Sequence, residues 1–128
     1  MKYAQQQANP IILVAETEDL VGFAWGYNLQ IKKFPFLDGL VENVTYMDEI
    51  AVISDVRTKG IGTLLGNEFL ESAKVVSSEV VLRTDERNTA SMALFKKLGF
   101  EPVRKQETII YDPEFPSRIY LRRELKCQ

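Results

Sequence analysis

The chain has 128 residues, of which 45% are hydrophobic and 27% are charged, the balance expected of one soluble globular domain spanning residues 1–128. A formal net charge of −2 argues against a general nucleic-acid-binding protein. No apolar run approaches the length of a membrane span, histidine is absent, and Cys127 is the only cysteine. We therefore expect a cytoplasmic protein with no membrane contact, no intrachain disulfide and no metal site.

The N-terminal part of the chain predicts three strands. Residues 10–16 and 20–29 are short apolar runs rich in β-branched residues, and the polar turn between them favours a β-hairpin. Pro35 and Gly39 indicate that residues 32–40 form a loop or a short turn of helix. Residues 42–53 are then a third predicted strand.

The rest of the chain predicts two helices and three strands. Apolar residues recur at helical spacing from Ile61 to Val76, and residues 78–84 are a strand, so this unit predicts a right-handed parallel crossover. A second helix is predicted from Asn88, a suitable N-cap, to Gly99, which suits the C′ position. Residues 100–112 and 117–125 are predicted as two further strands. The order β-β-β-α-β-α-β-β indicates an α/β domain with a mixed sheet.

The loop at residues 54–62, "SDVRTKGIG", combines basic residues with glycines between a strand and a helix start. Backbone N–H groups in such a turn converge on an anion, and Gly60 and Gly62 allow close approach. Arg57 and Lys59 add charge-assisted contacts. A solvated basic turn at a helix N-terminus explains this stretch equally well.

Two phosphate-binding motifs can be compared with this loop. The Walker A motif needs a lysine that "GIGTLLGN" lacks. The dinucleotide fingerprint is closer, because Gly60 and Gly62 are followed by Gly66 and by Asp85 about twenty residues on. However, Gly60 comes seven positions after Ile53, and three predicted strands precede the crossover. Both features argue against that fold.

Two segments resemble the GNAT superfamily of acyl-CoA-dependent N-acyltransferases. Residues 57–62 fit its signature [QR]-x-x-G-x-[GA], and "RNTASMALFKKLGF" resembles its second segment, an N-x-x-A/S helix that ends in L-G-F. The resemblance covers about residues 10–125. It implies a GNAT-like mixed, mostly antiparallel sheet with flanking helices. Compared with the family pattern, the chain would lack the strand and helix pair that usually precede the hairpin, because only nine residues precede Pro10.

The resemblance also implies a site for acetyl-CoA. The loop backbone would hold the pyrophosphate, and the pantetheine arm would lie along the third strand, which must diverge from the next strand at its C-terminal end. Asn88 would face the arm. The implied cofactor-binding residues are Ile50, Ala51, Val52, Arg57, Thr58, Lys59, Gly60, Ile61, Gly62, Thr63, Asn88, Ser91 and Phe95.

The implied reaction is direct attack of an amine on the thioester, which needs a base that is not histidine. Asp48 and Glu49 are adjacent, and on a regular strand they point to opposite faces. In polyamine acetyltransferases, which this stretch resembles, the first acid of the pair is the assigned base, so Asp48 is the first candidate and Glu49 the second. The alternative for either acid is a solvated or salt-bridged strand residue.

The chain departs from the family at Phe95, where a tyrosine often protonates the leaving thiolate. Tyr46, Tyr111 and Tyr120 are substitute candidates. We expect an acetyl-CoA-dependent N-acetyltransferase that acts on a primary amine of a small molecule. The alternative is a GNAT-fold acyl-CoA-binding module that is catalytically weak or regulatory. With so short an N-terminus, either the chain is a fragment or a partner subunit covers the exposed sheet edge and groove, and we predict a homodimer.

Overall fold

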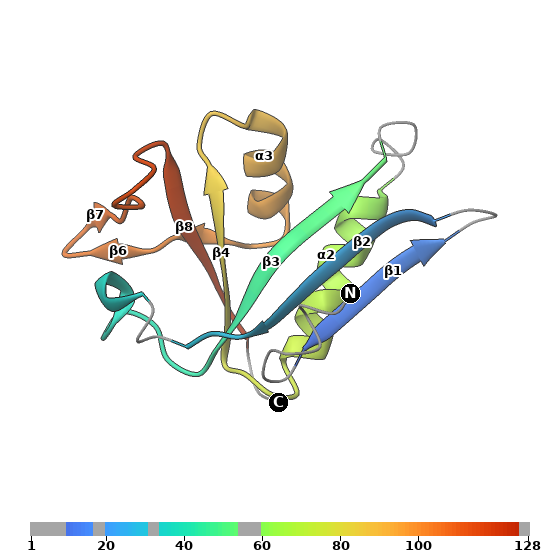
Figure 1. The fold of residues 1–128 in the computed structure, drawn as a ribbon, viewed down its shortest axis with the longest axis horizontal. Helices are drawn as coiled ribbons and strands as arrows, with labels where there is room; N and C mark the ends of the chain where they lie inside the picture. The colour runs from blue at the N-terminus through green and yellow to red at the C-terminus, as the bar shows by residue number, and fades with distance from the viewer. Residues whose placement is uncertain (1–9, 17–19, 31–33, 54–59, 126–128) are drawn as a thin grey trace.

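The computed structural model describes residues 10–16, 20–30, 34–53 and 60–125. Its main feature is a six-stranded sheet in the order β1-β2-β3-β4-β8-β5 (Figure 1). The mixed α/β fold predicted from the sequence is confirmed. The elements are β1 (Ile11–Glu16), β2 (Leu20–Asn28), η2 (Pro35–Leu37), β3 (Val44–Val52), α2 (Ile61–Ala73), β4 (Glu79–Asp85), α3 (Thr89–Lys97), β5 (Glu101–Pro102), β6 (Arg104–Lys105), β7 (Thr108–Ile109) and β8 (Arg118–Glu124).

The sheet is antiparallel except at one junction. β1, β2 and β3 form an antiparallel meander, which confirms the predicted hairpin, and β4 pairs antiparallel with β8. Among the strands that the structure describes, only β3 and β4 pair in parallel, since α2 connects them as a crossover. The helix α2 ends at Ala73, three residues before the predicted end at Val76.

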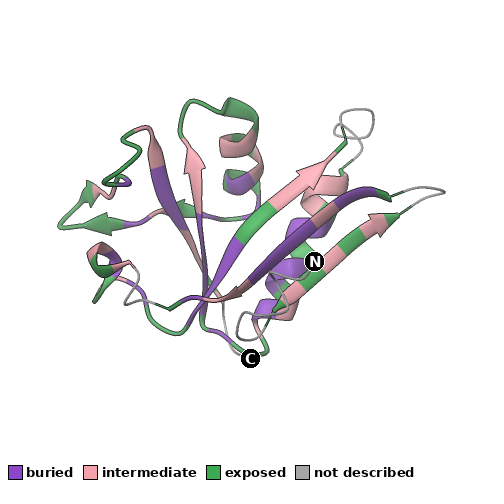
Figure 2. Ribbon diagram, in the orientation of Figure 1, coloured by how far each residue is buried: buried purple, intermediate pink, exposed green. Residues whose placement is uncertain are grey.

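Each face of the sheet has its own hydrophobic cluster. Both α2 and α3 pack on one face, which we call the helix face, through residues such as Phe69 and Phe95. On the opposite face, which we call the outer face, η2 and the following loop cover Tyr46 and Tyr120. Buried residues therefore concentrate in the central strands, while β1 alternates between half-buried and exposed positions (Figure 2).

The prediction of one strand over residues 100–112 is wrong. The segment is divided into β5, which pairs with β8, and a separate β6–β7 hairpin. Gln106 and Glu107 form the hairpin turn with φ values of 51° and 71°, the left-handed pair that a two-residue turn requires. Because Gln-Glu lacks the Asn-Gly or Asp-Gly signature of such turns, the sequence pattern did not reveal it.

The second helix begins and ends as predicted. The Oδ1 atom of Asn88 accepts a hydrogen bond from the Ser91 N–H at 3.1 Å, which is the N-cap interaction. Gly99 follows the helix with φ 88°, the left-handed conformation of a C′ glycine. Among the described residues, no helix is long and apolar enough to cross a membrane.

Candidate functional site: a fork between two parallel strands

The parallel strands β3 and β4 form a fork. They pair at only three positions, from Val44 with Glu79 to Tyr46 with Val81, and then diverge towards their C-terminal ends (Figure 1). This confirms the predicted divergence. Ile53 donates its N–H to Val21 on β2, so the alternation along β3 directs the N–H of Ile50 to the other side, into the fork.

A first cavity of about 390 Å³ lies where the end of β3 meets the starts of α2 and α3. Eight of the thirteen predicted cofactor-binding residues line it, while Phe95 lines a neighbouring cavity and Ile61 lines neither. Arg57, Thr58 and Lys59 lie outside the described residues. The lining residues are Ile50, Ala51, Val52, Gly60, Gly62, Thr63, Asn88, Ala90, Ser91 and Leu94.

The start of α2 has the properties of an anion site. Gly60 is the N-cap with φ 80°, a left-handed conformation that other residues adopt only with strain, and no side-chain cap is present among the described residues. The first intrahelical bond runs from Leu64 N–H to the Gly60 carbonyl. The N–H groups of Ile61, Gly62 and Thr63 precede it and lack such bonds, so they are available to a negatively charged group in the first cavity.

Gly66 and Asp85, the two further residues that the dinucleotide fingerprint would use, have structural roles in this fold. A Cβ at Gly66 would lie 2.4 Å from Leu98 Cδ1, so this glycine is needed for close packing of α2 against the end of α3. Asp85 accepts two hydrogen bonds from the Arg87 side chain and one from the Ser117 hydroxyl. These contacts hold the turn between β4 and α3, and they lower the pKa of Asp85.

A β-bulge in β3 changes the expected arrangement of the two acids. Trp25 on β2 pairs with Glu49, whereas the next residue, Gly26, pairs with Met47, so Asp48 is the extra residue of β3. The ring of Trp25 contacts that of Tyr27, which lies on the outer face. Because directly paired residues share a face, Glu49 also lies on the outer face.

Both acids consequently lie on the outer face, and the strict alternation predicted for Asp48 and Glu49 is wrong. Met47 packs in the cluster of the helix face and Ile50 packs against it, which leaves the two residues between them on the other side. The Tyr27 hydroxyl donates a hydrogen bond of 2.8 Å to Asp48 Oδ2. Tyr27 was not predicted as a site residue, because only the pairing of β2 with β3 brings it to Asp48.

A second cavity of about 220 Å³ lies within the fork itself. It contains both acids, residues of β4 and one side of α3, and it shares Ile50, Ser91 and Leu94 with the first cavity. The two cavities therefore meet at these three residues. The second is lined by Met47, Asp48, Glu49, Ile50, Leu82, Arg83, Thr84, Ser91, Leu94 and Phe95.

Residues 2–100 match the sequence profile of the Acetyltransferase (GNAT) family, which is more than half of the chain. The chain belongs to this family. Members are acetyltransferases that use acyl-CoA, and this chain is such an enzyme. The GNAT assignment agrees with the fork, the glycine-bearing helix start and the two adjacent cavities.

Solved structures share the GNAT fold. An acetyltransferase of the GNAT family from Streptococcus pneumoniae is 23% identical with a TM-score of 0.69, over 98% of this chain and 72% of that chain. Aminoglycoside 6′-N-acetyltransferase complexed with coenzyme A is 15% identical with a TM-score of 0.72, over 99% and 78%. The ribosomal-protein-S18-alanine N-acetyltransferase from Escherichia coli is 16% identical with a TM-score of 0.68, over 99% and 77%. This GNAT chain is thus shorter than these three.

The tyrosines considered as substitutes for the usual GNAT acid are poorly placed for that role. None of Tyr46, Tyr111 and Tyr120 is among the residues that line the two cavities. The Tyr120 hydroxyl donates to Asp112 at 2.7 Å, and burial together with this bond raises the pKa of Tyr120. The Tyr111 hydroxyl donates to Glu86, which raises its pKa, and burial raises the pKa of Tyr46.

An ion-paired network supports the β4 side of the fork. Arg83 Nη1 lies 2.9 Å from Asp112 Oδ2, and the Asp112 side chain also accepts hydrogen bonds from two backbone N–H groups of the following turn. Burial opposes ionisation of Asp112, but the hydrogen bonds from Arg83 and Tyr120 outweigh it and hold its pKa below the usual range. Arg83 lines the second cavity and was not predicted, because its partner is 29 residues away.

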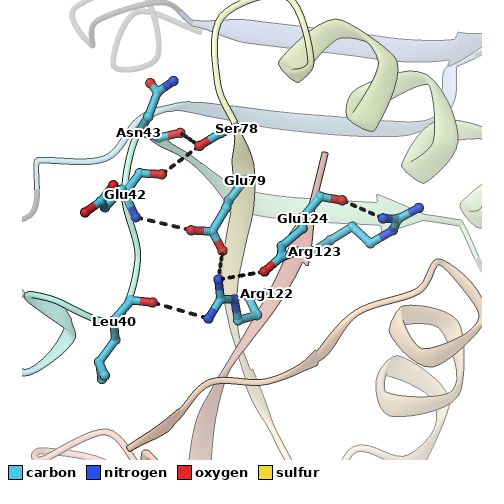
Figure 3. Close-up of polar contacts among 8 residues, drawn as sticks. All are labelled: Leu40, Glu42, Asn43, Ser78, Glu79, Arg122, Arg123 and Glu124. Carbon is cyan, nitrogen blue, oxygen red and sulfur yellow. Dashed lines mark hydrogen bonds and ion pairs between the residues drawn. The ribbon is translucent and has the colours of Figure 1, made fainter. Parts of the chain in front are cut away.

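A polar cluster stabilises the closed end of the fork, where β3 and β4 are paired (Figure 3). Glu79, at the first paired position of β4, is 6% exposed and its Oε1 lies 2.6 Å from Arg122 Nη2 on β8. Arg122 also donates to the Leu40 carbonyl, and Glu79 accepts from the Glu42 N–H. The cluster joins the loop before β3 to β4 and β8, and so it holds β3 against β4 where the two strands pair.

Proposed function

We propose that this enzyme transfers the acetyl group of acetyl-CoA to a primary amine of a small molecule by direct attack. The observation that carries the proposal is the meeting of the two cavities in the fork. The first offers backbone donors at the start of α2 and an extended strand edge at Ile50. The second offers two carboxylates, Asp48 and Glu49, on the outer face.

Acetyl-CoA fits the first cavity by the chemistry of its lining. The free N–H groups at the start of α2 suit a pyrophosphate. Gly60 and Gly62 present no side chain, and the nearest heavy atom to a Cβ at Gly62 would be 3.5 Å away, so neither glycine is required by packing. The amide-bearing pantetheine arm matches the N–H that Ile50 directs into the fork.

Asp48 is the residue that we propose as the base. A free amine with a pKa of about 10.4 is mostly protonated at neutral pH, so it must lose a proton before or during attack. The Tyr27 hydroxyl holds Asp48 Oδ2 at 2.8 Å, which orients the carboxylate and leaves Oδ1 for the amine or an intervening water. With Glu49 on the same face, the second cavity attracts a cationic acceptor.

A homodimer remains part of the proposal. Among the described residues, β1 pairs only with β2 and is an edge of the sheet. On the outer face of β1, the side chains of Ile12 and Val14 are 39% and 56% exposed. Such an apolar edge favours pairing with a second copy. Sedimentation at micromolar protein concentration should show a dimer, and a monodisperse monomer would contradict it.

The second candidate function is a catalytically weak or regulatory acyl-CoA-binding module. The observation that favours it is Phe95, which packs edge-on against Phe100 with a centroid distance of 5.8 Å and carries no proton donor. Under this alternative acetyl-CoA binds with no turnover on any amine.

Two measurements separate the candidates. Calorimetry measures the binding of acetyl-CoA, and the release of free thiol then measures turnover with polyamines, aminoglycosides and amino acids as acceptors. Asp48→Asn should lower kcat at least tenfold with unchanged acetyl-CoA affinity, while Glu68→Gln, an exposed acid on α2, serves as the matched control. Gly60→Glu should abolish acetyl-CoA binding by placing an anion at the helix start. Unaltered turnover of Asp48→Asn would remove Asp48 from the mechanism, and absence of CoA binding would overturn both functions.

A further inference from the structure

Ser91 occupies the junction between the two cavities. Only three described residues line both, namely Ile50, Ser91 and Leu94, and two of these have aliphatic side chains. Ser91 therefore supplies the side-chain hydroxyl of the junction. If the arm of acetyl-CoA fills the first cavity and the amine enters the second, the reacting sulfur lies at this junction.

The hydroxyl of Ser91 is available for a ligand. Its backbone N–H is used by the N-cap, since it donates to Asn88 Oδ1 at 3.1 Å. Its Oγ makes no hydrogen bond within the part of the chain that the structure describes, although the side chain is half-buried. A helical serine commonly satisfies its hydroxyl on a preceding carbonyl, so a half-buried hydroxyl without that bond can serve a group in the cavity.

Ser91 also lies next to the position that lacks a proton donor. Phe95 follows it by four residues in α3, so the two side chains occupy the same side of the helix, and both line the second cavity. The phenyl ring of Phe95 fills space in the helix-face cluster but offers no O–H group. Ser91 lines the first cavity as well, whereas Phe95 does not.

We propose that the Ser91 Oγ–H donates a hydrogen bond to the thioester sulfur and stabilises the thiolate as it departs; this inference rests on the proposed function. The amine nitrogen forms a bond to the carbonyl carbon, the carbon–sulfur bond breaks, and its electron pair goes to sulfur. Asp48 takes the proton lost by nitrogen, and the thiolate then takes a proton from water. Ser91 keeps its own proton throughout, so a hydroxyl of high pKa is sufficient.

The test compares the binding of CoA with that of desulfo-CoA, the analogue without the sulfur, by calorimetry at pH 9. Ser91→Ala should weaken CoA about tenfold, because a hydrogen bond to a thiolate is lost, and should leave desulfo-CoA affinity unchanged. Ser91→Thr should retain the difference between the two ligands. Thr89→Ala, which removes an exposed hydroxyl from the same helical turn, is the matched control and should also retain it.

Activity gives a second readout. Ser91→Ala should lower kcat, and Phe95→Tyr in the Ser91→Ala background should restore part of it by supplying a phenol to the same cavity. Equal weakening of CoA and desulfo-CoA by Ser91→Ala would overturn the proposal, because it would show a structural effect. Sulfur-dependent binding without turnover on any amine would support the Ser91 contact and refute the proposed function, whereas absence of CoA binding would overturn both.

Discussion

Replacing Arg122 by methionine should destabilise the fold strongly, because it leaves Glu79 buried without its partner. The Glu79 side chain is 8% exposed and that of Arg122 is 24% exposed, and their ion pair is 2.6 Å long. Removing one member of a buried pair costs about 3–5 kcal/mol, and the partial exposure of Arg122 favours the lower end. The hydrogen bond to the Leu40 carbonyl, at 3.3 Å, adds less than about 1 kcal/mol.

A loss of about 3–4 kcal/mol is a large part of the 5–15 kcal/mol that typically stabilises a domain, and it should lower the Tm by about 10–15 °C. Thermal and urea unfolding measure it. Arg87→Met is the matched control, since the Arg87–Asp85 pair is similarly short at 2.8 Å but the arginine side chain is 77% exposed, and it should shift Tm far less.

Replacing Glu79 and Arg122 together by methionine should cost less than Arg122→Met alone, because no unpaired carboxylate remains. A double variant at least as unstable as the single one would refute the reasoning. So would an Arg122→Met protein within about 1 kcal/mol of the original, since Glu79 would then be effectively hydrated. Because the cluster lies at the closed end of the fork, the folded Arg122→Met protein should still bind acetyl-CoA in calorimetry.

Three further outcomes are expected. Tyr27→Phe should lower kcat about tenfold with unchanged acetyl-CoA affinity, because Asp48 loses its orienting hydrogen bond; steady-state kinetics test this, and an unaltered kcat would contradict it. Gly60→Ala should cost about 1–2 kcal/mol in urea unfolding through its φ of 80°, although no atom lies within 4 Å of the new Cβ, and no loss would show that the turn relaxes. Because folding lowers the pKa of Asp112, its ionised carboxylate stabilises the folded protein at pH values above about 3.9, the pKa of an aspartate in an unfolded chain. This contribution to the free energy of unfolding should be lost progressively as the pH falls below about 4. Asp112→Asn should remove that part of the pH dependence, and an identical pH profile would contradict the assignment.

Local sequence signals predicted much of the fold. Alternation and turn residues identified the β1–β2 hairpin, and helical spacing identified α2 to within three residues of its end. Asn88 and Gly99 marked the two ends of α3 because capping depends on residues within one turn of each other. Most of the predicted cofactor-binding residues also line one cavity, since they follow motifs on contiguous elements.

The features that the sequence did not predict depend on partners distant along the chain. The bulge at Asp48 is defined only by the pairing of β3 with β2, and it moves both acids to the outer face. The Tyr27–Asp48 hydrogen bond spans 21 positions. The break in residues 100–112 depends on the backbone conformation of Gln106 and Glu107, a pair without the usual composition of a tight turn.

By itself, the sequence determined the order of the elements as far as α3, the caps of α3 and the glycine-bearing start of α2, because each depends on residues a few positions apart. The tertiary structure decided which side chains face each other across the fork. Strand register and divergence arise from pairing between segments far apart in the chain, and a shift of one residue changes the face on which a side chain lies. That is why Gly60 could be placed at a helix start from its motif, while the face of Asp48, its contact with Tyr27 and the place of Ser91 beside both cavities required the folded protein.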